Sequence, residues 1–582
     1  MTPRIQPMDN LSLAGIFETI ADLLEIQGEI IHKILAYRRA AESIRGLSRP
    51  VAELWQEGAL RTIPGVGEAI AGKIDEQMRT GKLDFFEKLK RQVPVTLIDV
   101  LRVGDVGPKK AARFWKELGI TSLPQLEAAA RAGKLRSLAG MGERSEARLL
   151  ESIAGLKARQ TTRISIARAR PVAADLLERL RQVPGVVAAE PAGSLRRWRE
   201  TVGDIDLLVG AHKPRAAIEA LLGFPEIARI RGQGDTKASV VLANGLPVQV
   251  WVHPPAHFGT ALQYATGSQA HNVRLRELAQ ERGMSLSEHG FKLKDGRSLE
   301  CSREEDVYAQ LGLPWIAPEL REDRGEVQAA LQGKLPELVT AQDIRGELHA
   351  HTDWSDGTAS LEQMAVAAAA AGLQYLVITD HSKSLGVANG LTPERVRKQR
   401  GGIEALQRKL GSRLRLLHGT EVEVLADGSL DFADDVLAGF DLVTASVHSS
   451  LRQSRQRVTE RMIAAIRHPH VDIIGHLTGR MIGARDPADL DLEAVFQAAA
   501  EQGVALEVNA HPERLDLNEA HARRASEIGC LLAVNTDAHR PEHFSLREYG
   551  LGIARRAWVT PANVVNAWPV EQVLLWAGGH AG

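Results

Sequence analysis

The chain has 582 residues, of which 44% are hydrophobic and 25% are charged, a composition typical of a globular protein with several domains. Its 72 basic and 73 acidic side chains give a net charge of −1, which taken alone argues weakly against a nucleic-acid-binding protein. Two cysteines, Cys301 and Cys530, exclude a disulfide framework, and we expect neither a membrane-spanning run nor a signal peptide. The sequence therefore predicts a cytoplasmic protein without a membrane partner.

The charges are distributed unevenly along the chain. Residues 1–300 carry 44 basic and 34 acidic side chains, whereas residues 301–582 carry 28 and 39. The stretch 101–200 alone has 20 basic and 10 acidic residues. This asymmetry predicts a polyanionic partner for the N-terminal part of the chain.

Residues 1–160 have helical periodicity, and a short glycine-containing turn recurs three times among them, each time before an amphipathic helix. The paired glycines are Gly65 and Gly67, Gly104 and Gly107, and Gly140 and Gly142. Glycine lets a backbone approach a phosphate closely, and a helix N-terminus supplies free N–H donors. We therefore predict helix–hairpin–helix contacts of these glycines and Lys109 with a DNA backbone; a plain corner between helices is the alternative.

From about residue 163 short β-type runs appear, and one of them carries two carboxylates. Asp204 and Asp206 are two residues apart, so a strand presents them on the same face. Two like charges this close favour a bound cation, and their oxygens suit Mg²⁺ or Mn²⁺. Gly193, Ser194 and Arg197 precede them and offer a backbone donor, a hydroxyl and a charge to triphosphate oxygens.

From residue 344 short apolar strands alternate with helices, which predicts parallel strands with crossover helices. Residues 345–545 contain 12 of the 19 histidines, and several of these follow an apolar strand directly. Strands that end in such side chains describe a (β/α) barrel with its site on the top face. Imidazoles and carboxylates converging there predict more than one transition metal, as in enzymes that attack phosphate esters.

Four strings resemble the family X DNA polymerases. The string 64–76 around Gly65 and Lys73 is similar to the family's lyase domain, the string 193–209 to its palm, and the strings 264–272 and 286–291 to its nucleotide-binding stretch and thumb. The resemblance implies that Lys73 forms a Schiff base with an abasic sugar, although alone it reads as a solvated helix lysine. It also implies that Gly267, Ser268 and Asn272 bind the nucleotide and that Arg276 contacts the template.

The sequence departs from this family at one catalytic position. The family has a third aspartate on a neighbouring strand, and Gln249 stands at that place, two residues before Trp251, where the family has an arginine. An amide is a poor Mg²⁺ ligand and cannot act as a base. If the strand is regular, His253 shares the face of Gln249 and can compensate in part, but imidazole is a second-choice Mg²⁺ ligand. We predict impaired primer extension. The alternatives are an active gap-filling polymerase, or a polymerase half that only binds DNA.

The C-terminal part resembles the PHP (polymerase and histidinol phosphatase) family, in the version fused to bacterial and archaeal family X polymerases (PolX). The resemblance implies up to three ions, Mn²⁺ or else Zn²⁺ or Fe²⁺, and a 3′–5′ exonuclease or DNA-end phosphoesterase. The implied ligands are His349, His351, Asp356, His381, Glu421, His448, His476, Asp537 and His539. Asp353 competes with Asp356, and a small-molecule phosphatase is the more distant alternative.

The expected architecture is therefore multidomain: helical helix–hairpin–helix regions, an α+β nucleotidyltransferase palm with a thumb, and a distorted (β/α)7 barrel. We expect a lyase-like domain at 1–85, fingers at 86–160, the palm at 161–258, the thumb at 259–317, a linker at 318–343 and the barrel at 344–582. The expected partners are dNTP and gapped, abasic or 3′-blocked DNA, bound by a monomer that acts in base excision repair.

Overall fold

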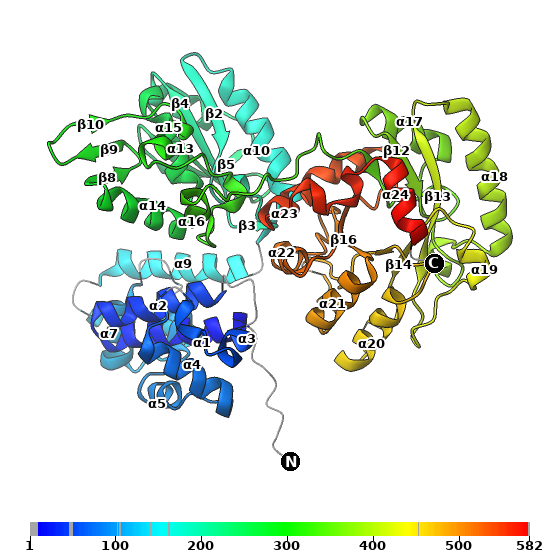
Figure 1. The fold of residues 1–582 in the computed structure, drawn as a ribbon. Coiled ribbons are helices and arrows are strands. Elements are labelled where there is room, and N and C mark those ends of the chain that lie inside the picture. Colours follow the sequence, from blue (N-terminus) through cyan, green and yellow to red (C-terminus); the bar gives the residue numbers. More distant parts are fainter. Residues whose placement is uncertain are drawn as a thin grey trace. The chain divides into compact units, whose positions relative to one another are not determined.

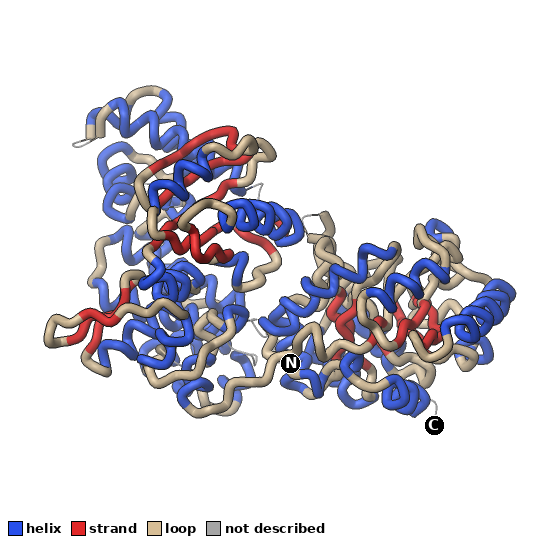
Figure 2. Tube along the Cα trace, turned by 90° about the horizontal axis from the view of Figure 1, so that it is seen from above, coloured by secondary structure: helices blue, strands red, loops and turns tan. Residues whose placement is uncertain are grey.

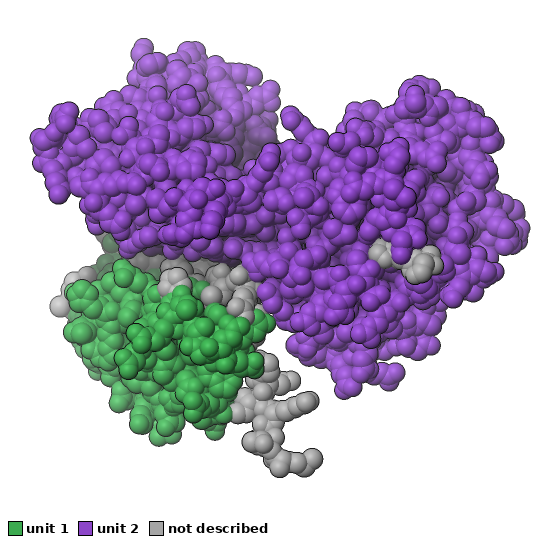
Figure 3. All heavy atoms as spheres, in the orientation of Figure 1, with its two compact units in different colours: residues 1–163 green, residues 164–582 purple. Residues whose placement is uncertain are grey.

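The computed structural model describes residues 10–45, 51–63, 65–101, 103, 106–138, 141–160, 163–451, 453–482 and 484–579. The chain forms two compact units, residues 1–163 and 164–582 (Figure 3). Each unit is described by itself. In the ranges given, no helix is both long enough and apolar enough to cross a membrane.

The first unit is helical, as the sequence predicts. Its helices are α1 (Asn10–Gln27), α2 (Ile31–Arg45), α3 (Val51–Gln56), α4 (Glu68–Thr80), α5 (Asp84–Gln92), α6 (Leu97–Leu101), α7 (Pro108–Leu118), α8 (Leu123–Arg131) and α9 (Glu143–Gln160). They pack around one hydrophobic core that includes Phe17, Ile74 and Phe114. Burial of this core stabilises the helices, of which α3 and α5 to α8 have 11 residues or fewer and are too short to be stable alone in water.

The palm region is built on a mixed five-stranded sheet of order β2-β4-β7-β6-β5. Its elements are β1 (Ile164–Ser165), α10 (Ile166–Arg181), β2 (Val186–Pro191), α11 (Gly193–Arg196), β3 (Thr201–Val202), β4 (Ile205–Ala211), α12 (Pro214–Leu222), β5 (Ile227–Gln233), β6 (Lys237–Leu242) and β7 (Pro247–His253). β4 and β7 are parallel neighbours, and their register pairs Asp206 with Gln249. The sheet therefore places these two side chains next to each other.

The thumb region and the segment after it follow the palm. Their elements are α13 (Phe258–Thr266), α14 (Gln269–Glu281), β8 (Met284–Ser287), β9 (Gly290–Leu293), β10 (Ser298–Leu299), α15 (Glu304–Gln310) and α16 (Glu326–Leu331). Residues 318–343, where we expected a linker, contain α16 and bury Arg321, Glu326 and Val339. Buried charges require partners: Arg321 pairs with Glu304, and Glu326 pairs with His271. This segment is packed structure and not a free tether.

The C-terminal part has seven parallel strands in sequential order, surrounded by helices (Figure 1). The strands are β11 (Gly346–Glu347), β12 (Tyr375–Ile378), β13 (Arg415–Glu423), β14 (Leu442–Ser446), β15 (Ile473–Ile474), β16 (Ala505–Asn509) and β17 (Leu532–Asn535). The helices are α17 (Leu361–Ala370), α18 (Pro393–Leu410), α19 (Asp434–Leu437), α20 (Arg455–Ile466), α21 (Leu492–Gln502), α22 (Glu519–Ile528), α23 (Arg547–Arg556) and α24 (Val570–Gly578).

An isolated parallel bridge between Ala350 and Ala538 joins the ends of β11 and β17. The seven strands therefore form a nearly closed barrel, as predicted, and the strands of the palm and of the barrel lie in two separate groups (Figure 2).

Palm and barrel share one continuous hydrophobic core. Trp198 of the palm packs edge-on against Tyr549 of the barrel at 6.1 Å between ring centroids. A Cβ added to Gly552 in α23 would come within 2.6 Å of Trp198, so glycine permits this close approach. The contact fixes the barrel against the start of the palm.

Candidate functional site

The residues expected to be metal ligands lie together at the carboxyl ends of the barrel strands. They are His349 and His351 after β11, Asp356 before α17, His381 after β12, Glu421 in β13, His448 after β14, His476 after β15, and Asp537 and His539 after β17. The carboxyl ends of parallel strands meet at one rim of a barrel. The fold therefore brings residues almost 200 positions apart into a single cluster.

Glu421 lies at the centre of this cluster. Its two carboxylate oxygens are 2.9–3.5 Å from nitrogens of five imidazoles, those of His349, His351, His381, His448 and His476. The Glu421 side chain is 1% exposed. One buried carboxylate facing five imidazoles would be placed to hold more than one metal ion.

Two aspartates complete the cluster. Asp537 Oδ1 is 3.1 Å from His351 Nε2, and Asp356 Oδ1 is 3.5 Å from His539 Nε2. Ligand atoms within 4.8 Å of one another form three groups: His351, Asp356, His381 and His539; His349, His351 and Glu421; and His381, Glu421 and His448. The exposed Asp353 belongs to none of these groups.

Several polar atoms of the cluster are buried without a hydrogen-bond partner. They are Nε2 of His349, both ring nitrogens of His351, Oε1 of Glu421 and Nδ1 of His476. Leaving a buried polar atom unpaired costs about 1–3 kcal/mol. Since the atoms point into a set of imidazole and carboxylate donors, the residues present fit bound transition-metal ions.

The same side chains line a cavity of about 210 Å³. Its wall also contains Arg514, whose Nε lies 3.9 Å from Asp537 Oδ2. Arg514 lies in the loop after β16. A guanidinium beside the cluster provides a cationic contact for a phosphate oxygen.

The carboxylates and imidazoles shift each other's protonation. Burial lowers the pKa of His381, but Glu421 and Asp356 outweigh burial and raise it to about 10. Burial, together with the charges of His539 and His381, lowers the pKa of His351 to about 3. Burial would raise the pKa of Glu421, but the surrounding imidazoles outweigh burial and hold this pKa well below its usual range. The cluster is thus strongly coupled.

Two glutamates that the sequence reasoning missed orient the imidazoles. Glu507 Oε1 is 2.7 Å from His349 Nδ1, and Glu423 Oε2 is 2.7 Å from His448 Nδ1. Nδ1 thereby donates to a carboxylate and Nε2 is left as the ligand atom. Glu507 Oε2 also accepts the N–H of His476, which adopts a positive φ of 22°. The spacing Glu421-x-Glu423, which places both side chains on one face of a strand, could have indicated Glu423.

The other histidines near the barrel lie outside the groups described above. His418 is buried against Gln399 and Phe440, and His521 is half-buried. His468 pairs with Asp434, and the ring of His470 lies beside it. His543 Nδ1 accepts the N–H of His539 and so lies directly behind the cluster.

In the palm, Asp204 and Asp206 lie beside Gln249. Gln249 Nε2 donates to Asp204 Oδ2 over 2.6 Å. Burial, and then the charge of Asp204, raise the pKa of Asp206 to about 7. A Cβ on Gly193 would come within 2.0 Å of Asp206 Oδ2, so only glycine fits there. The third position thus presents an amide donor where a metal pair requires an anion.

His253 does not make up for the missing carboxylate. It shares a face of β7 with Gln249, but four residues of strand separate the two positions by about 13 Å. Its ring lies 5.7 Å from that of His289 in the thumb. Our expectation of partial compensation by His253 was therefore wrong.

Most of the residues expected to contact a nucleotide line a cavity of about 400 Å³. Its lining includes Arg197, Gly267, Ser268, Asn272 and Arg276. Arg197 Nη1 donates to the Thr266 carbonyl oxygen over 2.6 Å. Ser194 lies on α11 beside Gly193 and is not among the residues that line this cavity.

The three glycine turns of the first unit have one backbone hydrogen bond in common. The N–H of Val66, Val106 and Met141 donates to the carbonyl oxygen three residues earlier, over 3.0 Å in each turn. Gly67, Gly107 and Gly142 then directly precede α4, α7 and α9, and Lys109 is exposed in the first turn of α7. Gly104 and Gly140 lie outside the described residues.

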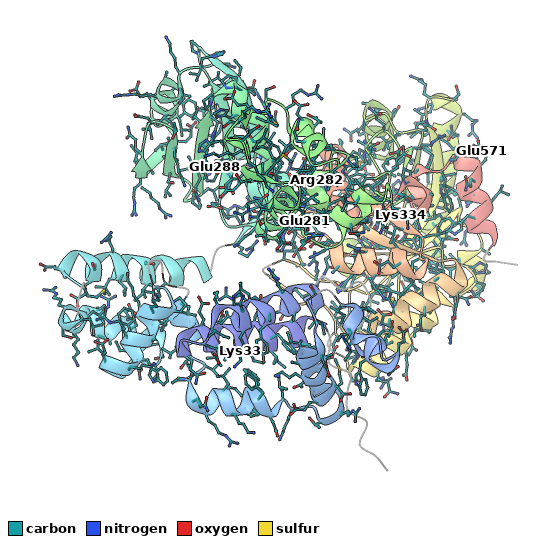
Figure 4. The ribbon with its side chains drawn as sticks, turned by 60° about the vertical axis from the view of Figure 1, so that its left-hand side comes forward. Lys33, Glu281, Arg282, Glu288, Lys334 and Glu571 are labelled. Atoms are coloured by element: carbon teal, nitrogen blue, oxygen red, sulfur yellow. The ribbon has the colours of Figure 1, made fainter. Side chains whose placement is uncertain are left out.

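Lys73 lies on α4 beside aromatic rings. Its Nζ is 5.1 Å from the ring centroid of Phe85 and 6.0 Å from that of Tyr37. Lys33, labelled in Figure 4, lies on α2 with its Nζ 5.8 Å from the same Phe85 ring. Two amines therefore flank one aromatic side chain.

Family models match four segments of the chain. They are a helix-hairpin-helix domain at residues 8–83, a SAM-like helix-hairpin-helix tandem at 97–154, a DNA polymerase beta thumb at 261–322 and a PHP domain at 347–511. The order of these segments agrees with the order of the regions in the structure.

Among curated proteins, the chain is 37% identical to the DNA polymerase/3′-5′ exonuclease PolX of Bacillus subtilis (strain 168), over 97% of this chain and 99% of that protein. It is 28% identical to DNA polymerase lambda of Rattus norvegicus over 54% of this chain and 56% of that protein. A probable phosphatase of Thermoanaerobacter sp. (strain X514) is 31% identical over 34% of this chain and 78% of that protein.

Proposed function

Because the chain belongs to the PolX family of DNA polymerase/3′-5′ exonucleases with a C-terminal PHP domain, we propose that its barrel hydrolyses phosphodiester bonds at DNA 3′ ends. The observation that carries the proposal is the buried cluster around Glu421, with its unpaired ligand atoms. The nine residues named above would hold up to three ions, Mn²⁺ first and Zn²⁺ or Fe²⁺ as alternatives. Bound ions supply Lewis-acid activation of the phosphodiester and of water.

The protein's own side chains contribute binding and orientation to this reaction. Arg514 contacts a non-bridging phosphate oxygen, and Glu507 and Glu423 hold two imidazoles by Nδ1. In the hydrolysis the oxygen of water bonds to phosphorus and the P–O3′ bond breaks. The strand takes up a proton at its new 3′-oxygen, and a 5′-mononucleotide is released.

The experiment for the barrel replaces both His349 and His351 by alanine. We expect loss of nuclease activity on 3′-ended DNA with Mn²⁺, while DNA affinity stays unchanged. The matched control is the pair His468→Ala and His470→Ala, which has the same spacing in the same domain and lies outside the cluster. Nuclease activity that survives the first double change refutes the assignment.

For the palm we propose that DNA and dNTP bind and that primer extension is impaired. Asp204 and Asp206 would hold the ion that accompanies a nucleotide, and the cavity lined by Arg197 and Asn272 would receive the nucleotide itself. The amide of Gln249 donates to Asp204 and brings no negative charge to a second ion. The alternative is a gap-filling polymerase that tolerates Gln249.

Single-nucleotide gap filling tests the palm, in the background of the double change at His349 and His351 so that degradation does not mask synthesis. We expect Gln249→Asp to raise extension with Mg²⁺ and with Mn²⁺. The gain must disappear when Asp204 and Asp206 are both replaced by asparagine. Extension by the unchanged palm as fast as that of the Gln249→Asp variant overturns the proposal.

For the first unit we propose a lyase step on abasic DNA. The Lys73 amine attacks C1′ of the sugar, water leaves, and a Schiff base forms. Borohydride reduction traps this adduct, and we expect Lys73→Arg to abolish trapping while Lys116→Arg leaves it intact. Undiminished trapping by the Lys73 variant excludes this role.

A further inference from the structure

A second and larger cavity lies beside the metal cluster. It has a volume of about 480 Å³, against about 210 Å³ for the cavity at the cluster. Arg168 and its neighbours at the start of the palm form one wall, and loops at the top of the barrel form the other, with Met481, Ile482, His511 and Arg540. We call it the rim cavity. None of the functional residues named above belongs to it.

The rim cavity is built from the same loops as the metal cluster. His511 lies three residues before Arg514, in the loop after β16, and Arg514 lines the cluster cavity. His543 accepts the N–H of His539, and its ring lies 5.6 Å from that of His511. A molecule whose phosphate lies at the cluster therefore has the rim cavity directly beside it.

The chemistry of the lining suits a nucleoside with its phosphate. Met481, Ile482 and Pro512 provide apolar surface for a base, and Arg168 and Arg540 are the cations. Glu513 is the one carboxylate among the lining residues. Bases stack on apolar and guanidinium surfaces with little dependence on sequence, and arginine pairs with phosphate.

The two histidines add hydrogen-bonding groups to the wall. Arg540 Nε lies 2.8 Å from His543 Nε2, so the guanidinium lies along the cavity wall. The wall therefore offers two imidazoles beside two arginines.

We propose that the rim cavity binds the 3′-terminal nucleoside of the DNA strand whose phosphodiester lies at the metal cluster. The cluster cavity is smaller than the roughly 300–1,000 Å³ of sites that enclose a small organic ligand. It accommodates the phosphodiester, whereas the nucleoside has to lie next to it. This inference rests on the proposed nuclease function and adds a substrate subsite to it.

Photocrosslinking tests the proposal without any hydrolysis. The probe is a single-stranded oligonucleotide with 4-thiothymidine at its 3′ end, irradiated with the full-length protein in EDTA. We expect adducts on peptides that contain residues 481–485, 511–513 or 540–546. The absence of adducts from all three segments overturns the proposal, even if the protein proves to be a nuclease.

A kinetic comparison separates this subsite from the metal cluster. The variant Arg168→Ala with Met481→Ala should raise KM for single-stranded DNA by about tenfold or more. Hydrolysis of bis(p-nitrophenyl) phosphate, which has no base, should stay unchanged, and Arg408→Ala on the exposed end of α18 is the control. An unchanged KM for DNA contradicts the subsite, whereas loss of both activities would show that the changes damage the cluster. If the unchanged protein cleaves neither substrate, the nuclease function itself has failed, and the crosslinking result still decides the subsite.

Discussion

At the scale of single residues, the metal centre depends on carboxylates placed behind the imidazoles. Glu507 is buried and touches His349 Nδ1, the N–H of His476 and Nδ2 of Asn535. It therefore holds two predicted ligands, one that follows the neighbouring strand β15 and one that follows β11. Such outer partners raise ligand basicity and hold the ring orientation.

We predict that Glu507→Gln weakens metal binding by about 10–100-fold, because an amide does not hold Nδ1–H of His349 as a carboxylate does. Metal content after dialysis, measured by inductively coupled plasma mass spectrometry, checks this. Glu501→Gln, on the exposed end of α21, is the matched control. Full metal content in the Glu507 variant would show that His349 orients itself without this partner.

Arg514 is a second single residue on which the site depends, but its proposed role is to contact the substrate and not to bind a metal ion. We predict that Arg514→Ala lowers kcat for DNA hydrolysis by about 100-fold, because the cavity loses its cationic contact for the phosphate. Metal content should not change, since Arg514 is not a ligand. Loss of metal from this variant would instead show that Arg514 positions Asp537, which lies 3.9 Å away.

At the scale of elements, the structure separates two roles of glycine in the hairpins. Gly65 has a φ of +76°, and its added Cβ would meet Arg39 Cβ at 3.1 Å, so this glycine is required by the turn. Gly67, Gly107 and Gly142 have no heavy atom within 4 Å of an added Cβ. Their small size leaves space beside a helix N-terminus.

We therefore predict that alanine at these two kinds of glycine position affects different properties, DNA affinity in one case and stability in the other. Gly67→Ala with Gly107→Ala should fold with a stability change within about 1 kcal/mol and bind gapped DNA more weakly, because a methyl group keeps the phosphate from the helix N-terminus. Gly65→Ala should lower the thermal midpoint. Fluorescence anisotropy across a salt series and thermal unfolding measure the two effects. Equal DNA affinity for the first variant would mean that these turns are only corners.

Position on an element explains what the sequence could predict about the site. His349, His381 and Asp537 follow short apolar strands, so their place at one rim followed from the order of strands and helices. Glu507 lies inside a strand, and the sequence alone does not show which side chain a glutamate in a strand contacts. Only the fold shows that it faces His349. The packing of residues 318–343 could not be predicted from the sequence either, because the ion-pair partners of the buried Arg321 and Glu326 are distant in the chain.

At the scale of the whole molecule, an ion network joins palm and barrel. Arg556 of α23 contacts Glu519 and lies 2.9 Å from Glu322. Glu322 in turn lies 3.0 Å from Nε of Arg197, which lines the 400 Å³ cavity of the palm. Arg556 is 2% exposed, so removing one partner leaves an uncompensated buried charge.

We predict that Glu519→Gln destabilises the second unit by about 3–5 kcal/mol at pH 7. Burial raises the pKa of Glu519, but Arg556 outweighs burial and holds the pKa well below its usual range. A carboxylate with a lowered folded pKa stabilises above its unfolded pKa of about 4.3, and this contribution is lost as the pH falls further. Thermal unfolding from pH 7 to pH 3 should show the two proteins converging at acidic pH. A constant difference would assign the effect to packing.

The core that palm and barrel share has a consequence for the path of the DNA. Trp198 and Gly552 pack against each other, so if the palm holds DNA and the barrel cleaves it as proposed, a primer end has to cross a fixed separation as unpaired strand. The number of nucleotides that must be unpaired is then set by the protein and not by the substrate. DNA with an overhang shorter than that number should bind in the palm without being cleaved by the barrel of the same molecule. Cleavage by that barrel should therefore begin at a sharp threshold of overhang length.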